Sequence, residues 1–464
     1  MALLGTGQAR RATICDHNMT DAPSQDLAAW LGTQPGLARI EMFLADINGA
    51  AKGKWLAPDK AAGVAKKGLA MPVSVYAQDA FGRDVAGAGL AFGTGDPDGL
   101  AFPVAGRFAP MPWLDAASAQ VLITLRGKDG GPCAADPRGV LENVLARYAA
   151  RSLTPVVATE QEFYLYRPVD GRPTPPDGEM LRNDTLSTAA LAAHAALFDE
   201  MFEAFATQGI PADGLTSEAG PGQYEINLLH RADALAAADD VVLLKRTVKA
   251  LAKKHGLGAT FMAKPYGEAS GNGMHIHASV LDADGANILA AADGTPSAAL
   301  RHAVAGLLAA MPGCMLAFAP HANSYRRLRP DAHAPISAGW GFDDRSAAIR
   351  VITGDAKVTR IEHRISGADC NVYMAMAAML GAMLEGIEAA QEPPAPQDPL
   401  NPGAGEPLPT EWGAAMAAFA ASPQVEAIFG ARFRDIYIAC KKQDREVFLA
   451  DIPPLEYTAY LDLA

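Results

Sequence analysis

Apolar residues recur along the chain with two different periods, and these periods predict both strands and helices. The clearest strand signal runs from Val156 to Tyr166, because Val156 and Val157 lead into the segment and it ends in aromatic residues. Shorter alternating or β-branched segments also favour strands. These additional strands are predicted over residues 40–46, 52–56, 120–126, 259–263 and 274–281.

Longer segments carry apolar side chains at helical spacing. One helix is predicted to begin at Asp136, because an aspartate at the N-cap followed by Pro137 is typical of a helix start. An Ala-rich helix is predicted over residues 187–208, with Gly209 as its end. Other helices are predicted over residues 26–31, 234–254 and 297–311, from Asn371 onward, and as short helices after a Pro-rich loop at 392–410.

This order of elements predicts an α+β fold with more than one domain. Residues 1–21 are predicted to form a disordered extension. Residues 22–130 are predicted to form a small N-terminal domain, and residues 131–464 a larger domain. The boundary is placed at Gly130-Gly131-Pro132, where two glycines and a proline interrupt the pattern.

The composition narrows the class of partners. The chain has 464 residues and a net charge of −13, which argues against nucleic acid as a partner. Its five cysteines form no CxxC pair, which favours a reducing cytoplasm and offers no thiolate metal site. The most apolar segment, residues 372–390, carries Glu385 and Glu388, so we predict a buried helix and no membrane association.

Carboxylates gather in two of the predicted extended segments. Glu160 and Glu162 project to the same face of their strand, because side chains alternate along a strand. Glu218 and Glu225 lie on either side of a Gly-Pro-Gly bend, which lets the backbone approach a ligand closely. The alternative is a solvated strand face and a loop with incidental acids.

Histidines and arginines follow the same in-phase arrangement. His275, His277 and Ser279 share one face of a strand that follows a glycine-rich loop. A single histidine is more often a core residue, but two in phase favour ligand contact. Arginines, whose forked guanidinium groups suit phosphates and carboxylates, occur at 345, 350, 360 and 364, with Glu362 among them. The alternative here is a surface ladder of ion pairs.

Taken together, these side chains are the equipment for phosphoryl transfer. Five glutamates with one or two imidazoles suit Mg²⁺ or Mn²⁺ better than zinc. Divalent ions beside arginines neutralise the charge of a transferring phosphate. The chain has no Walker A loop, so a nucleotide would be held in another way.

Six motifs, in this order, are similar to those of the glutamine synthetase family. They cover the chain from about Ile40 to the C-terminus. The motifs are Glu160-x-Glu162, Glu218 with Gly222-Gln223-x-Glu225, Lys264-Pro265 with Gly273-Met274-His275-x-His277, Asn323-Ser324-Tyr325-Arg326-Arg327, Arg345-Ser346, and Arg360-Ile361-Glu362-x-Arg364.

The resemblance implies a fold and an assembly. The N-terminal domain would be a β-grasp domain, and the catalytic domain would be a curved antiparallel sheet, or half-barrel, flanked by helices. The chain would form a homo-oligomer, expected as a dodecamer of two hexameric rings, in which each active site is completed by a neighbour's N-terminal domain.

The resemblance also implies ligand sets, with ATP and L-glutamate as substrates. One divalent ion would be held by Glu162, Glu218 and Glu225, and the other by Glu160, His275 and Glu362. Substrate glutamate would be bound at Glu162, Ser270, Gly271, Arg327 and Arg364. ATP would be bound by His277, Ser279, Lys357 and Arg360, and the transferring phosphate would face Arg345 and Arg350.

Departures from the ammonia-using members point to a different nitrogen substrate. His333 occupies the flap position where those members carry a glutamate, and residues 74–82 replace the loop Phe-Asp-Gly-Ser-Ser. These differences resemble the γ-glutamylpolyamine synthetase branch. His333 and Asp79 are the candidates for accepting the amine proton, and Tyr76, Phe81 and Trp340 are candidates for lining the alkyl tail of an amine.

The sequence therefore predicts an ATP-dependent ligase that joins the γ-carboxylate of glutamate to an amine through γ-glutamyl phosphate. Two alternatives remain open at this point. One is an ammonia-using glutamine synthetase, and the other is a structural or regulatory homologue without activity.

Overall fold

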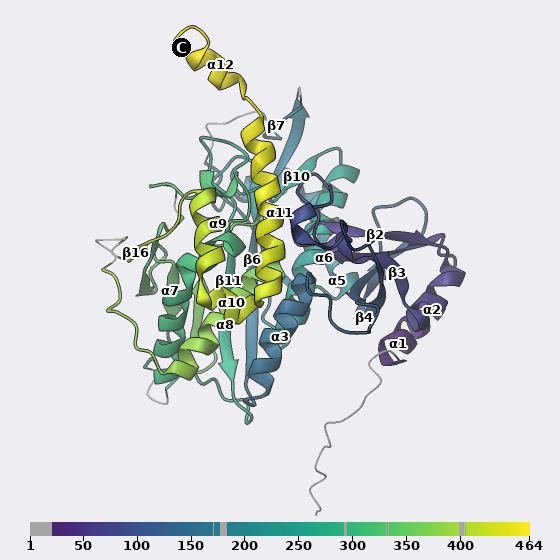
Figure 1. The fold of residues 1–464 in the computed structure, drawn as a ribbon, viewed down its shortest axis with the longest axis horizontal. Coiled ribbons are helices and arrows are strands. Elements are labelled where there is room, and N and C mark those ends of the chain that lie inside the picture. The colour runs from purple at the N-terminus through teal and green to yellow at the C-terminus, as the bar shows by residue number, and fades with distance from the viewer. Residues whose placement is uncertain are drawn as a thin grey trace, which may run out of the picture.

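The chain is described here by a computed structural model that covers residues 21–169, 171–176, 183–291, 295–330, 332, 334–398, 403 and 405–464. Two sheets and the helices around them form two lobes (Figure 1). The predicted extension lies outside the described residues except for Asp21, where α1 (Asp21–Gly32) begins. The expected α+β fold class is confirmed.

The N-terminal lobe is a five-stranded sheet in the order β2-β1-β5-β4-β3. β1 pairs parallel with β5 and antiparallel with β2, so the sheet is mixed. The strands are β1 (Arg39–Ala45), β2 (Ala51–Leu56), β3 (Leu69–Pro72), β4 (Asp98–Pro110) and β5 (Ser118–Arg126). The helical segments of this lobe are α1, α2 (Pro58–Lys67), η1 (Val73–Tyr76) and η2 (Ala86–Ala88).

The larger lobe is built on a curled, nearly antiparallel sheet with the path β13-β14-β15-β11-β6-β9-β8. Its strands are β6 (Thr154–Val169), β8 (Ala212–Ser217), β9 (Gln223–Leu228), β11 (Met274–Leu281), β13 (Trp340–Phe342), β14 (Ile349–Ile352) and β15 (Arg360–His363). β7 (Arg172–Thr174) and β10 (Gly258–Thr260) each pair with β6. β12 (Ser337–Ala338) and β16 (Glu406–Pro407) pair with each other in a separate two-stranded sheet.

Helices cover this sheet and close the chain. They are α3 (Pro137–Ala149), α4 (Thr188–Ala192), α5 (Ala195–Gln208), α6 (Ala234–Lys254), α7 (Ala298–Phe318), η3 (Ser324–Arg326), α8 (Val372–Ala389), α9 (Trp412–Ala421), α10 (Pro423–Phe429), α11 (Ala431–Ala450) and α12 (Pro454–Tyr460). α12 leads away from the body of the molecule, at the top of Figure 1.

α7 and α8 form the apolar centre of the larger lobe. Both are long and apolar enough to cross a membrane by length and composition, yet 67% and 78% of their most apolar windows are buried inside the protein. A Cβ added at Gly306 would lie 2.1 Å from the carbonyl oxygen of Ala382, and one at Gly386 would lie 2.1 Å from that of His302. The two backbones therefore touch at the glycines, and the predicted buried helix at 372–390 is confirmed.

Three sequence predictions of helices need correction. The predicted helix at 187–208 is two helices, because His194 leaves the helical conformation (φ −123°, ψ 24°) and its ring packs on Phe198 and Tyr224. α7 runs on to Phe318 past Pro312, beyond the predicted end at 311. α11 has 20 residues and is not one of the short helices expected at the C-terminus.

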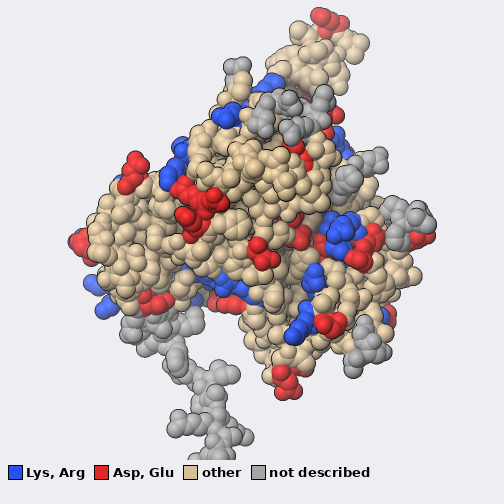
Figure 2. All heavy atoms as spheres, turned by 180° about the vertical axis from the view of Figure 1, so that it is seen from behind, with Lys and Arg blue, Asp and Glu red and all other residues tan. Residues whose placement is uncertain are grey.

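Buried polar contacts tie the N-terminal sheet to the larger lobe. Arg107 of β4 donates to Asp240 of α6 at 2.9 Å, and Lys441 of α11 donates to Asn48 in the β1–β2 turn at 2.6 Å. Figure 2 shows acidic and basic side chains interspersed on the face opposite to that of Figure 1, without a continuous field of either sign. The domain boundary near residue 130 stays a prediction.

Asp46 is a buried carboxylate in the β1–β2 turn, and its ionisation can be tested. Its carboxylate accepts the backbone N–H groups of Asn48 and Ala50 at 2.9 and 2.8 Å, and its residue is 1% exposed. Burial, partly offset by these bonds and by Lys52, raises the pKa of Asp46 to about 6. Above this pH the folded protein therefore holds an ionised carboxylate in a site that favours the neutral form.

We predict that Asp46→Asn stabilises the protein at pH 8, by up to about 3 kcal/mol, and that the gain vanishes near pH 4. Asparagine keeps the oxygen acceptor, whereas the charge penalty exists only above the pKa of the unfolded aspartate. Urea unfolding at pH 4, 6 and 8 measures the difference. A constant difference across this pH range would contradict the assignment.

Candidate active site

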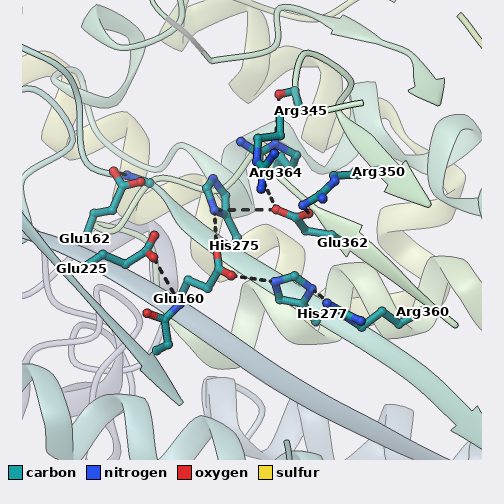
Figure 3. A network of polar contacts seen from close by, with 12 residues as sticks. Glu160, Glu162, Glu225, His275, His277, Arg345, Arg350, Arg360, Glu362 and Arg364 are labelled. Atoms are coloured by element: carbon teal, nitrogen blue, oxygen red, sulfur yellow. Dashed lines mark hydrogen bonds and ion pairs between the residues drawn. The ribbon is translucent and has the colours of Figure 1, made fainter. Parts of the chain in front are cut away.

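The predicted carboxylates and histidines meet at the centre of the curled sheet (Figure 3). Strand register brings them together: Glu160 lies opposite His275, Glu162 opposite Glu225, and His277 opposite Glu362. Residues paired across strands share a face, so all six side chains project to the same side. Gln161 and Phe163 alternate with the glutamates and are fully buried on the other side, as predicted.

Glu160 is the hub of this group. One of its oxygens lies 2.8 Å from Nδ1 of His275 and the other lies 3.0 Å from Nε2 of His277. Arg360 then donates Nε–H to Nδ1 of His277 at 3.3 Å, so His277 presents an acceptor on that side. The row β15-β11-β6 thus carries a continuous chain of polar contacts.

Glu362 is held by two arginines. Arg350 donates to one of its oxygens at 2.9 Å, Arg364 forms a close ion pair with the other, and only 1% of the Glu362 side chain is exposed. Burial opposes the ionisation of Glu362, but the neighbouring Arg364 and the histidines outweigh it and lower its pKa. Glu362 is therefore ionised at neutral pH.

The other end of the site has an excess of negative charge. Burial and repulsion by Glu160, Glu162 and Glu218 raise the pKa of Glu225 to about 9. Burial and the nearby Glu162 raise the pKa of Glu218 to about 7. Carboxylates crowded in this way repel each other unless a cation lies among them.

These donors fit divalent cations. Two sets of three residues could each hold one ion, because within each set the ligand atoms lie within 4.8 Å of one another. One set is Glu160, Glu225 and His275, and the other is Glu160, His277 and Glu362. Carboxylate oxygens with an imidazole suit Mg²⁺ or Mn²⁺. The grouping brings His277, which was predicted to bind the nucleotide, close to the predicted ligands Glu160 and Glu362. The assignment of individual ligands to each ion stays a prediction.

The glycine-rich loop before β11 closes over Glu162. Gly273 donates its N–H to Glu162 at 2.7 Å, and a Cβ at Gly273 would lie 2.9 Å from Nη2 of Arg327. A Cβ at Gly271 would lie 2.7 Å from the carbonyl oxygen of Ala263 and 2.8 Å from Arg327. A side chain at Gly271 would collide with the backbone of Ala263, whereas one at Gly273 would have to displace the end of the buried Arg327 side chain.

Sequence reasoning gave no role to several side chains that build this loop. Gln223 donates to the carbonyl oxygen of Gly271 and to Oδ1 of Asn272, both at 3.0 Å, and accepts from the N–H of Gly220. Tyr164 donates to the carbonyl oxygen of Ser270 at 2.8 Å. Gln223 could have been identified as a site residue because it lies within the Gly222-Gln223-x-Glu225 motif. The sequence around Tyr164 indicated only that it lies on a strand.

Two further neighbours were also missed. Asn227 donates to Glu225 at 3.1 Å, which orients the carboxylate on β9. Asp343 forms an ion pair with Arg350, which already binds Glu362. Asn227 lies two residues after Glu225 on β9, and Asp343 directly follows β13, which pairs with the strand of Arg350.

Four further predicted residues are Arg345, Ser279, Lys357 and His333. Arg345 is exposed and its carbonyl oxygen accepts from Arg364 at 3.1 Å. Ser279 lies on β11 beyond His277, and Lys357 is exposed in the β14–β15 loop. His333 lies outside the described residues.

Asp79 lies apart from the cluster within this chain. Its carboxylate accepts the N–H groups of Phe81 and Arg83, the side chain of Arg83, and Gln443 of α11. Burial opposes its ionisation, but these bonds outweigh it and lower its pKa. The catalytic role of Asp79 stays a prediction. Such a role would require Asp79 to face the active site of another copy of the chain.

Residues 134–460 match the glutamine synthetase catalytic domain family. The chain belongs to the glutamine synthetase family. This family member is 37% identical to γ-glutamylputrescine synthetase PuuA of Escherichia coli (strain K12), over 91% of each chain. It is 32% identical to the glutamate–isopropylamine ligase of a Pseudomonas species, over 82% of this chain and 87% of that protein. The solved GmaS/ADP complex has a TM-score of 0.83 and 25% identity, and it covers 94% of this chain and 99% of that one.

We predict that Glu225→Ala abolishes turnover and weakens Mn²⁺ binding without unfolding the protein. Loss of an outer-shell partner alone costs roughly 10- to 100-fold in metal affinity, so loss of a direct ligand should cost at least 100-fold. Removing one of several repelling carboxylates should leave the metal-free protein at least as stable.

Electron paramagnetic resonance titration with Mn²⁺ and thermal unfolding without metal separate the two effects. Glu142→Gln, at an exposed position on α3, is the matched control and should behave as the wild type. Near-normal Mn²⁺ affinity in Glu225→Ala would contradict the proposed ligand role.

Proposed function

We propose that this protein is an ATP-dependent ligase that joins the γ-carboxylate of L-glutamate to a primary amine. The observation that carries the proposal is the array of carboxylates, histidines and arginines on one face of the sheet, in the order expected for the family. The relatives named for putrescine and isopropylamine support an amine as the nitrogen substrate.

The reaction has two chemical steps. An oxygen of the γ-carboxylate attacks the terminal phosphorus of ATP, and the P–O bond to ADP breaks, which gives γ-glutamyl phosphate. The amine nitrogen then attacks the acyl carbon, phosphate leaves with the C–O electron pair, and the nitrogen loses a proton to give the amide. Divalent ions among the glutamates would supply charge neutralisation for the phosphates.

Different side chains of the site would bind glutamate, the transferring phosphoryl group and ATP. Arg327 packs against the Gly271–Gly273 loop, and its guanidinium with the loop would hold substrate glutamate. Arg364, which is paired with Glu362, would bind substrate glutamate together with Arg327. Arg350, which also donates to Glu362, and Arg345 would stabilise charge on the transferring phosphoryl group. Arg360, which donates to His277, would bind ATP together with His277, Ser279 and Lys357.

The amine site must be assigned differently from the first expectation. Tyr76 is buried and accepts the N–H of Leu125, and Trp340 is buried and donates to the carbonyl oxygen of Pro394. Neither ring can line an open pocket within this chain. Phe81 remains a candidate because 57% of it is exposed.

Two alternatives follow from the same fold. An ammonia-using glutamine synthetase would share every metal and glutamate position, and it differs only at the nitrogen site. A homologue without activity is disfavoured because all the predicted ligand positions carry suitable side chains. We further propose a cytoplasmic homo-oligomer, a dodecamer of two hexameric rings, in which Asp79 and Phe81 face a neighbour's site.

The first test is a comparison of nitrogen substrates. With ATP, glutamate and Mg²⁺, we expect kcat/KM for at least one of putrescine, ethanolamine, isopropylamine and methylamine to exceed that for ammonium. Burial of each methylene contributes about 0.8 kcal/mol, which ammonia cannot gain. Phosphate release measures all five. Ammonium as the best substrate would favour glutamine synthetase, and no release with any of them would favour the inactive homologue.

The second test concerns the flap position 333. We expect His333→Glu to raise kcat/KM for ammonium and to lower it for the amines, because a carboxylate attracts a small cation and accepts its proton better than an imidazole. His333→Gln is the neutral control. Unchanged substrate preference in His333→Glu would show that another group sets the choice.

A further inference from the structure

A cleft of about 510 Å³ separates the N-terminal sheet from α6. Four basic residues of α6 form one wall: Lys245, Arg246, Lys249 and Lys253. The opposite wall is formed by Phe43, Trp113 and the β1–β2 turn at 49–51. A volume of this size is typical of sites for small molecules, which range over roughly 300–1,000 Å³.

The cleft lies on the other side of the sheet from the carboxylates. The ammonium groups of Lys245 and Lys249 lie 5.6 and 5.7 Å from the ring centre of Phe261, which packs against Phe163. Phe163 follows Glu162 on β6 and therefore points to the opposite face. The cleft is thus distinct from the proposed catalytic centre.

The positive charge of the cleft is only partly compensated. Arg246 is paired with Glu41 and donates to Gln120 at 2.8 Å. The ammonium groups of Lys249 and Lys253 have no hydrogen bond or ion pair within the part of the chain that the structure describes. Lys249 keeps an exposed side chain in the cleft, yet desolvation by the surrounding walls and repulsion by Lys245 lower its pKa.

Lys245 connects the cleft to the glycine-rich loop of the active site. Its ammonium donates to the carbonyl oxygens of Ala368 and Cys370 at 2.6 and 3.2 Å. Ala368 in turn donates its N–H to Asn272 at 3.1 Å, and Gly367 forms a bridge with Gly273. The nearby carboxylate of Asp369, which favours the charged form of Lys245, accepts a hydrogen bond from Ser324 at 2.6 Å.

We propose that this cleft binds a small organic anion, a monophosphate or carboxylate with a flat or apolar body, and that its occupancy alters glutamate binding. Lys249 and Lys253 would bind the anionic group, and Phe43 and Trp113 would contact the body of the ligand. An anion drawing on Lys245 weakens its hold on residues 368–370, which support the loop at Gly271–Gly273. A segment of a second copy in the cleft is the competing occupant.

Pyridoxal 5′-phosphate is a suitable probe, because it is an aromatic monophosphate whose aldehyde forms an imine with a nearby uncharged lysine. The assembled protein is incubated with the probe and saturating Mg²⁺–ATP, reduced with borohydride, and mapped by peptide mass spectrometry. We expect the label to concentrate at Lys249 or Lys253, and pyridoxal, which lacks the phosphate, to label at least about fivefold less.

Matched variants identify the site. Lys249→Met should lose this labelling, whereas Lys254→Met, on the same helix but bonded to Glu200 outside the cleft, should keep it. Labelling spread over surface lysines, or labelling at Lys249 only after the assembly is dissociated, would overturn the proposal. These readouts do not depend on ligase activity, so they stand apart from the proposed function.

The coupling is tested on the active ligase. Unreduced probe should change the KM for glutamate by about fivefold or more, a common size for linked sites, with a smaller change in kcat. Lys249→Met should abolish this response and leave turnover without the probe unchanged. Labelling of the cleft without any change in KM would overturn the coupling.

Discussion

Repulsion among carboxylates is the constraint on which this structure depends. Glu160, Glu162, Glu218 and Glu225 share one end of a sheet face, and no lysine or arginine is paired with any of them within the described ranges. Such a group is tolerated only where the scaffold is rigid and a cation can enter. Strand register provides the rigidity, since Glu160 and Glu225 have partners on both neighbouring strands and Glu162 is paired with Glu225. Arg350 and Arg364 pair with Glu362, two strands away from β6, so they leave the Glu162–Glu225 end of the site without a counter-charge.

Much of this arrangement could be predicted from local sequence, and the limits have physical causes. Alternation along β6 and β11 correctly indicated which side chains share a face, because that depends only on the strand period. The contact of His277 with Glu160 was not predictable in the same way, since register between distant strands is a property of the whole sheet. The N-cap at Asp136 and the start of α8 at Asn371 were local signals and were confirmed.

The errors share one cause, which is tertiary packing that overrides local preference. Nothing in an Ala-rich segment predicts a break at His194, because the break depends on rings contributed by Phe198 and by Tyr224 of β9. Tyr76 was expected at a pocket, but its hydroxyl fits beneath β5 and bonds Leu125. Gln223 is similar: its side chain joins β9 to the glycine-rich loop across a bend, a contact that no spacing along the chain encodes.

The glycine contact between α7 and α8 has a consequence for how the chain is made. α8 is as apolar as a membrane-spanning helix, and a nascent segment of that kind is prone to aggregation and to mistargeting until it is covered. α7 precedes it along the chain and leaves the ribosome first. α7 is therefore already available when α8 emerges, so the order of synthesis allows α8 to be covered against the Gly306 contact as soon as it is made.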